Sequence, residues 1–170
     1  MSEIDPLEVE SVGEPATGAS EGDASPEAPA NDANSAKFSV MSVETVTFDL
    51  TDPSPVVHLM EADPPFRYLA IPLALGDATA MHQAIGGVDG RRPGTHELLG
   101  EVFRRTQIDV IAARIVRYEG GVFFGQLDLM TPRGREVFDC RTSDAITIAM
   151  RQNVPAPVLC AEEVLAALYD

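Results

Sequence analysis

Two short stretches of the sequence combine charged, hydroxyl and imidazole side chains in patterns that suit phosphate chemistry. The first runs from Arg92 through Pro93, Gly94 and Thr95 to His96, at the start of a predicted helix. A helix N-terminus presents unpaired N–H groups and favours anions, a guanidinium binds pairs of phosphate oxygens, and a histidine transfers protons near neutral pH. The stretch predicts an anion site built from Arg92, Thr95 and His96. The alternative is that Pro93 and Thr95 only set the helix start.

The second stretch joins a predicted strand to a predicted helix and contains Asp139, Arg141, Ser143 and Asp144. Asp139 and Arg141 stand two residues apart, so they share one face of the strand. Together with Asp144 they predict a site that holds a divalent cation or orients a phosphate. An Arg–Asp ion pair, with Ser143 or Thr142 capping the helix, explains the same residues structurally and stays open.

Other catalytic patterns are absent from the sequence. It has no Gly-rich phosphate loop, no G-x-S-x-G turn and no H-E-x-x-H helix. Cys140 and Cys160 do not have zinc-ligand spacing. The acidic N-terminus does not resemble a signal peptide, so a cytoplasmic location and reduced thiols are expected. No apolar run approaches the roughly 20 residues of a membrane span, which argues against a membrane partner.

Charge divides the chain into two parts. Residues 1–36 contain nine acidic side chains and no Lys or Arg, whereas residues 37–170 contain 18 acidic and 12 basic side chains. The first part is also poor in aliphatic residues and cannot bury enough apolar surface to fold. We therefore expect a disordered acidic tail over residues 1–40 and a folded domain over 41–170, with Met41 as an alternative start of translation. The mild charge of the domain does not predict an avid nucleic-acid binder.

Hydrophobic periodicity and turn residues predict the elements that position these motifs. The predicted strands are Val43–Leu50, Val56–Glu61, Tyr68–Leu73, Asp109–Tyr118, Val122–Met130, Glu136–Cys140 and Pro157–Cys160. The predicted helices are Asp77–Ile85, His96–Arg105, Asp144–Met150 and Ala161–Leu168. Hairpins with interspersed helices favour a single layered α+β domain, with a mixed, largely antiparallel sheet and three to four helices. A small open sheet leaves strand edges, so a homo-oligomer is expected.

Two of these elements have a predicted core face. In the helix over 96–105, Thr95 is the expected N-cap, and the apolar stripe consists of Leu98, Leu99, Val102 and Phe103. In the strand over 122–130, Phe123, Leu127 and Leu129 alternate with Phe124, Gln126 and Asp128. The alternation predicts that the first set faces the core and the second faces solvent.

The two motifs, in this order and about 45 residues apart, resemble those of the bifunctional nuclease domain family. That family carries Arg-Pro-x-Thr-His-x-Leu, matched by Arg92–Leu98, and later Asp-x-Arg-Pro-Ser-Asp-Ala-Ile, similar to Asp139–Ile146. Its hairpin Gly-x-Phe-x-Ala resembles Gly121–Gly125, and its terminal Glu-Glu-Val-Leu is present as Glu162–Leu165. The resemblance covers nearly all of residues 41–168.

Three positions depart from the family pattern. Thr142 stands where the family usually has proline, which is expected to loosen the turn before the helix. Asp77 replaces a glutamate that opens the earlier helix, which shortens the carboxylate arm. Gly125 replaces the usual alanine of the hairpin. None of the three removes a candidate functional group.

The resemblance implies a nuclease that hydrolyses RNA and DNA. Under this hypothesis Asp77, Asp139 and Asp144 are candidate ligands of Mg²⁺ or Mn²⁺, which activates water. The candidate catalytic residues are His96, Asp139 and Asp144, and the candidate substrate-binding residues are Arg92, Thr95, Arg141 and Ser143.

The nuclease hypothesis requires the two motifs to converge in space. A separation of more than roughly 10 Å between their side chains excludes a joint site. The competing hypothesis is a non-catalytic binding or regulatory module, in which the same residues form helix caps and ion pairs.

Overall fold

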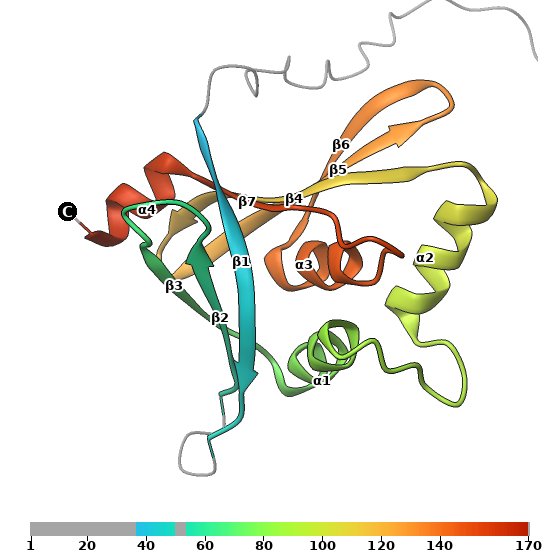
Figure 1. The fold of residues 1–170 in the computed structure, drawn as a ribbon, viewed down its shortest axis with the longest axis horizontal. Coiled ribbons are helices and arrows are strands. Elements are labelled where there is room, and N and C mark those ends of the chain that lie inside the picture. Colours follow the sequence, from blue (N-terminus) through green and yellow to red (C-terminus); the bar gives the residue numbers. More distant parts are fainter. Residues whose placement is uncertain (1–36, 50–53, 170) are drawn as a thin grey trace, which may run out of the picture. The chain divides into compact units, whose positions relative to one another are not determined.

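A computed structural model describes residues 37–49 and 54–169 of the chain. These residues form seven strands and four helices (Figure 1). The strands are β1 (Phe38–Thr47), β2 (Val56–Glu61), β3 (Tyr68–Pro72), β4 (Asp109–Glu119), β5 (Val122–Thr131), β6 (Gly134–Arg141) and β7 (Val158–Ala161). The helices are α1 (Leu75–Ile85), α2 (Thr95–Arg105), α3 (Thr142–Met150) and α4 (Glu162–Tyr169).

All seven strands belong to one open sheet with the order β3-β2-β1-β7-β4-β5-β6. Each neighbouring pair is antiparallel except β7 and β4, which run parallel. Figure 1 shows α1, α2 and α3 grouped together, with α4 apart from them. The predicted α+β class and the mixed, largely antiparallel sheet are confirmed.

The largest difference from the predicted strands is at β1. It begins at Phe38, five residues before the predicted start at Val43, and ends at Thr47 rather than at Leu50. Its first residues, Phe38 to Met41, pair with β7. This partner lies about 120 residues further along the chain, so no local sequence pattern predicts the pairing. Leu50 and the first residues of the predicted turn after it lie outside the described residues.

Each of the three helices near the two motifs begins earlier than predicted. Helix α1 begins at Leu75 and α3 at Thr142, without a side-chain cap. The predicted capping by Ser143 or Thr142 is therefore wrong. In α2 the N-cap is Gly94 rather than Thr95, and the Glu97 carboxylate accepts a hydrogen bond of 2.6 Å from the Gly94 N–H. The N-terminal turns thus extend further into the two motifs than the sequence indicates.

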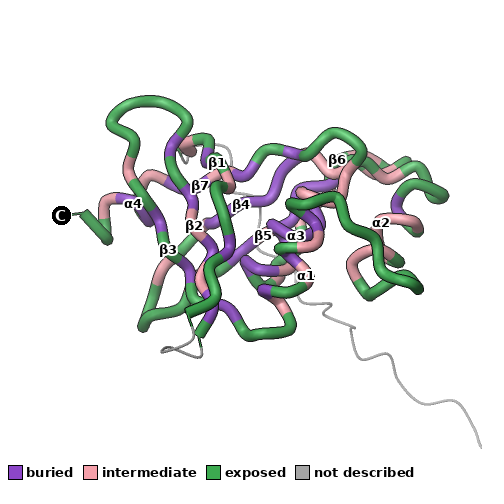
Figure 2. The backbone as a smooth tube through the Cα atoms, turned by 60° about the horizontal axis from the view of Figure 1, so that its bottom comes forward, coloured by how far each residue is buried: buried purple, intermediate pink, exposed green. Residues whose placement is uncertain are grey.

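Helix α3 lies at the centre of the core and packs against α1, α2, β4 and β5. Figure 2 shows α3 and the adjoining strands largely buried, whereas α2 is mainly half-buried or exposed. The predicted apolar stripe of α2 is correct only in part. Phe103 is buried, but Leu98 and Val102 are 57% and 44% exposed. Among the helices of the described residues, none is long and apolar enough to cross a membrane.

Asp128 of β5 is fully buried, although the alternation of the strand predicts a solvent-facing side chain. Two arginines reach its carboxylate: Arg114 of β4 at 2.5 Å and Arg135 of β6 at 2.6 Å. A buried carboxylate requires such partners, because desolvation of an unpaired charge is costly. The three side chains therefore connect three neighbouring strands on the face opposite to Leu127 and Leu129.

A close backbone approach connects β5 to the start of α3. A Cβ atom added to Gly125 would lie 2.7 Å from Cα and 2.8 Å from N of Thr142. The buried Thr142 side chain donates a hydrogen bond of 3.0 Å to the Phe123 carbonyl, so it fastens α3 to β5. The loosening expected from a threonine at this position is therefore compensated by a new hydrogen bond.

The C-terminal helix covers part of one sheet edge. The Tyr169 hydroxyl accepts a hydrogen bond from the Tyr68 N–H at 2.6 Å and donates one to the Tyr68 carbonyl at 2.5 Å. Both backbone groups belong to edge strand β3, which ends at Pro72. Helix α4 thus occupies hydrogen-bonding positions that another strand would need.

A buried acid gives the fold a predicted dependence on pH. The Arg67 guanidinium donates to Glu61 at 2.7 and 2.9 Å, and these hydrogen bonds lower the pKa of Glu61 from 4.5 to about 2. A carboxyl with a lowered folded pKa stabilises the fold above its unfolded pKa, and this contribution is lost as the pH falls from about 4.5 through about 2.

We therefore expect Glu61→Gln to unfold at a lower temperature than the wild type near neutral pH. The difference should shrink as the pH falls toward about 2, because the wild-type carboxyl is then protonated as well. Thermal unfolding followed by circular dichroism at both pH values measures it. A difference of equal size at neutral and acidic pH would contradict this account of Glu61.

Candidate functional site

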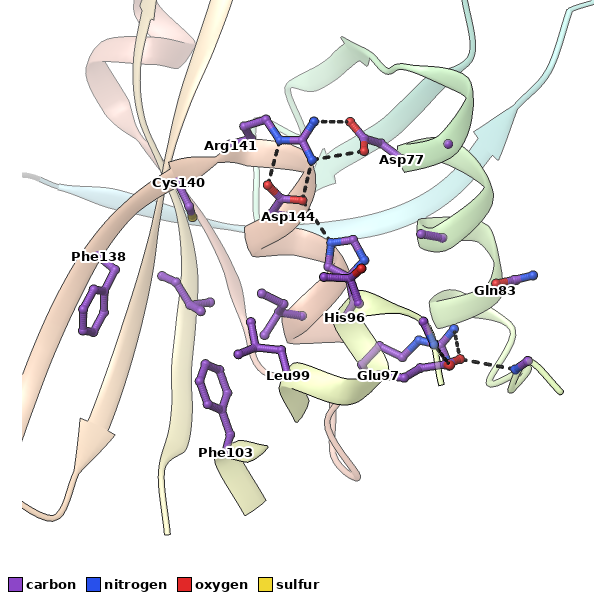
Figure 3. Close-up of a pocket in the computed structure, with 18 of the residues that line it drawn as sticks. Asp77, Gln83, His96, Glu97, Leu99, Phe103, Phe138, Cys140, Arg141 and Asp144 are labelled. Carbon is purple, nitrogen blue, oxygen red and sulfur yellow. Dashed lines mark hydrogen bonds and ion pairs between the residues drawn. The ribbon is translucent and has the colours of Figure 1, made fainter. Parts of the chain in front are cut away.

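The first turns of three helices meet at one place. Asp77 comes from α1, His96 from α2 and Asp144 from α3, and Arg141 precedes α3 at the end of β6. Figure 3 shows their side chains pointing toward one another beside a pocket. Two motifs that lie about 45 residues apart in the sequence therefore converge in space.

The closest link between the two motifs is the pair His96 and Asp144. His96 Nε2 lies 3.0 Å from Asp144 Oδ1. The two side chains are 17% and 25% exposed, so solvent screens them only in part. Burial raises the pKa of the Asp144 carboxyl, but hydrogen bonds from Arg141 and His96 outweigh it and keep this pKa below its usual value. Asp144 is therefore an anion that orients the imidazole.

Arg141 lies between two carboxylates. Its Nε and Nη2 donate to Asp144 at 2.7 and 2.9 Å, and its Nη1 donates to Asp77 at 3.0 Å. Its hydrogen bonds with Asp144 raise the pKa of Arg141. Ser143 completes the network with a hydrogen bond of 3.2 Å from its hydroxyl to Asp77. Asp77 thus reaches the network although its side chain is shorter than the glutamate of the family pattern.

The network borders a pocket of about 790 Å³ between α1, α2, α3 and the strands β5 and β6. Arg92 and Thr95 line this pocket, together with Asp77, His96, Arg141 and Asp144. In Figure 3 the side chains of Asp77, His96, Arg141 and Asp144 stand together, and Phe138, Phe103 and Leu99 lie elsewhere along the wall. The pocket therefore has a charged end and an apolar end.

Arg92 differs from Arg141 and Arg151 because it has no counter-ion among the residues that the structure describes. No hydrogen bond or ion pair joins its guanidinium to any residue that the structure describes. The neighbouring Arg91 is also exposed and unpaired within the described ranges, but it does not line the pocket. An unpaired guanidinium that lines a pocket is available to an anionic ligand.

The structure does not bring Asp139 into the network. Cys140 lines the pocket, so alternation along β6 turns Asp139 to the opposite face, where its carboxylate accepts a hydrogen bond of 2.9 Å from Gln126. No group of three or more His, Cys, Asp or Glu side chains with metal-ligand geometry occurs among residues 37–49 and 54–169. Asp77, Asp139 and Asp144 therefore do not form one metal-ligand set, and a guanidinium already lies between two of them.

The sequence of this domain matches a known protein family. Residues 57–168 match the family described as "Bifunctional nuclease domain". The chain belongs to the bifunctional nuclease domain family. Two similar proteins, from two strains of Mycobacterium tuberculosis, carry the description "Uncharacterized protein". Each is 35% identical over 112 residues, which covers 66% of this chain and 65% of the relative.

Two departures from the pattern of the bifunctional nuclease domain are in contact with each other. Gly125 and Thr142 approach so closely that the backbone of Thr142 excludes a side chain at position 125. The family-typical alanine therefore does not fit the present backbone. Glycine at this position lets the start of α3, with Arg141 and Asp144, lie close to β5.

A second ion-pair group, which the sequence analysis did not single out, holds the loop before α2. Arg151 donates to the Val88 carbonyl at 3.0 Å and pairs with Glu97 at 2.9 Å. Glu97 also accepts from Gly94, and hydrogen bonds from the Gly94 and Gly90 N–H groups help to lower the pKa of Glu97 against its burial. The spacing from Gly94 to Glu97 is that of half a capping box, which is a usable sequence signal. Arg151 follows α3 and has no such signal.

Cys140 contributes a thiol to the pocket lining beside the network. Burial raises the pKa of its thiol to about 11, and the Asp144 and Asp139 carboxylates add to this effect. The thiol therefore stays protonated near neutral pH and is a poor nucleophile. It serves as part of the pocket wall.

Proposed function

We propose that this domain hydrolyses phosphodiester bonds of RNA and DNA at the charged end of the pocket. The observation that carries the proposal is the contact of 3.0 Å between His96 and Asp144, which joins the two motifs beside the pocket. An imidazole oriented by a carboxylate is a common general base. Membership of the bifunctional nuclease domain family supports the same reaction class.

The roles follow from the contacts of each side chain. With the proton of the imidazole on Nε2, donated to Asp144, Nδ1 is the acceptor. Nδ1 takes a proton from water as the water oxygen attacks phosphorus and the ester bond breaks, and the leaving oxygen takes a proton from solvent. Arg92 contacts the phosphate, and Arg141 adds positive charge beside it. No step is assigned to Asp139.

A second candidate is a non-catalytic binding module. One observation favours it: Arg141 is engaged by both Asp77 and Asp144, as in an ion-pair network that fixes the start of α3. Under this alternative the pocket binds an anion through Arg92 but no bond is broken.

The full chain is incubated with labelled single-stranded RNA and DNA and with duplex DNA, in Mg²⁺, in Mn²⁺ and in EDTA. We expect cleavage by the wild type, and a decrease of about tenfold to a hundredfold in Arg92→Gln, which removes the unpaired charge at the pocket. Arg91→Gln is the matched control and should retain nearly full activity. Binding of these substrates without cleavage under all conditions would support the module instead.

The same proposal includes a cytoplasmic location, where RNA and DNA are accessible. It also includes a homo-oligomer that uses the edge of the sheet at β6, which has no strand partner among the described residues. Light scattering coupled to size-exclusion chromatography measures the number of chains. A monomer at micromolar concentration would contradict the proposed homo-oligomer.

A further inference from the structure

The apolar end of the pocket takes no part in the proposed hydrolysis. We call it the apolar floor, and it consists of Leu99, Phe103, Leu127, Leu129 and Phe138. Phe103 is buried, but Phe138 of β6 is 48% exposed and presents its ring at the pocket wall (Figure 3). Exposed rings beside a pocket commonly contact ligands, because their burial by a ligand releases water from apolar surface.

The two ends of the pocket together restrict the chemistry of the ligand. At one end the charge of Arg141 is offset by Asp77 and Asp144. Arg92 also lines the pocket and pairs with no residue that the structure describes, so its charge suits an anion. The other end offers an aromatic ring and aliphatic side chains, so it suits a flat apolar group. The volume of about 790 Å³ lies within the range of roughly 300–1,000 Å³ of pockets that enclose small ligands. A nucleotide carries both groups, its phosphate and its base, joined through one sugar.

We propose that the apolar floor is a subsite for one unpaired nucleobase, which stacks on Phe138 while its phosphate lies toward Arg92 and His96. This inference rests on the proposed function and names its substrate class: single strands and unpaired nucleotides. In a duplex both faces of a base are stacked and its edge is paired, so a base enters such a subsite only after it leaves the helix. Single strands present their bases without this cost.

Binding of small probes tests the subsite without any need for cleavage. Titration calorimetry compares adenosine 5′-monophosphate with ribose 5-phosphate, which has the phosphate but no base. We expect the wild type to bind the nucleotide about tenfold more tightly, because stacking on one aromatic ring strengthens binding by roughly fivefold to a hundredfold. In Phe138→Ala the two affinities should differ by less than about twofold, with the affinity for ribose 5-phosphate unchanged.

The matched control is Phe66→Ala. Phe66 has a similar exposure of 52% and does not line the pocket. This variant should keep the full preference for the nucleotide. A second variant, Phe138→Leu, retains an apolar side chain in β6 but removes the ring, and it should lose most of the preference. The subsite is refuted by equal binding of both probes to the wild type, or by a preference that survives in both Phe138 variants.

The two proposals fail in different ways. If the nucleotide preference depends on Phe138 but no substrate is cleaved, the subsite holds and the nuclease proposal fails. If single strands and duplexes are cleaved at equal rates and Phe138→Ala has no effect, the nuclease proposal holds and the subsite fails. When both hold, single strands should be cleaved at least about tenfold faster than a duplex of the same sequence.

Discussion

His96→Ala is expected to slow phosphodiester cleavage by about two to four orders of magnitude, the usual contribution of a general acid–base group. The variant loses the imidazole of the pocket wall, which no other described lining residue supplies, and keeps Arg92, Arg141 and Asp144. Single-turnover rates with saturating enzyme measure the chemical step directly. Because Arg92 still binds the phosphate, the apparent affinity for the substrate should change much less than the rate.

Two further variants make the His96 result interpretable. His82→Ala removes an exposed histidine of α1 that does not line the pocket, and it should leave the rate unchanged. Asp144→Asn keeps the shape of the side chain but removes the anion that orients the imidazole, so its rate should fall nearly as far as that of His96→Ala. Wild-type rates in a correctly folded His96→Ala protein would exclude His96 as the catalytic base.

Gly125→Ala is expected to destabilise the fold by about 1–3 kcal/mol, which is the usual cost of forcing extra volume into a packed site. The added methyl group would overlap the Thr142 backbone at 2.7 Å, so either β5 or the start of α3 has to move. Such a shift also displaces Arg141 and Asp144. Chemical denaturation measures the free energy of unfolding, and the cleavage assay of the same protein reports on the site.

Gly100→Ala provides the control for this prediction. Gly100 lies in α2, and a Cβ atom added there has no neighbour within 4 Å. The substitution should stabilise the protein by up to about 1 kcal/mol, because alanine restricts the unfolded chain and favours a helix. If both variants were equally stable, the contact between Gly125 and Thr142 would not be as tight as the structure indicates.

The elements that could be predicted are those defined by local sequence. β2 was predicted with its observed bounds, and β4 and β5 to within one residue, because apolar runs are bounded there by turn residues such as Gly120 and Gly121. The position of β7 between β1 and β4 could not be predicted. It depends on pairing between segments that are far apart in the chain, and a local pattern carries no information about the partner.

For the candidate site, too, local features could be predicted from the sequence and long-range contacts could not. The convergence of His96 with Asp144 was required by the nuclease hypothesis and is present in the structure. Asp139 was misplaced because β6 ends at Arg141. The Arg141 side chain turns toward Asp77 and Asp144 and lines the pocket, so it does not share a face with Asp139 as the alternation predicted. The alternation along β5 predicted an exposed Asp128. Its burial could not be predicted, because its two arginine partners lie on neighbouring strands. Phe138 carried no signal, since an apolar residue in a strand is more often core than pocket wall.

The two hydrogen bonds between the Tyr169 hydroxyl and the Tyr68 backbone make the two edges of the sheet unequal. On β3 the outward-facing backbone positions are Tyr68, Ala70 and Pro72; the first is occupied by Tyr169 and the last has no N–H group. A foreign strand would find a single donor there, whereas β6 has no such cover among the described residues. Strand addition is thus possible on one side only. If two copies paired through their β6 edges, neither would have an open edge left for a third copy. This favours a closed dimer over a growing fibre.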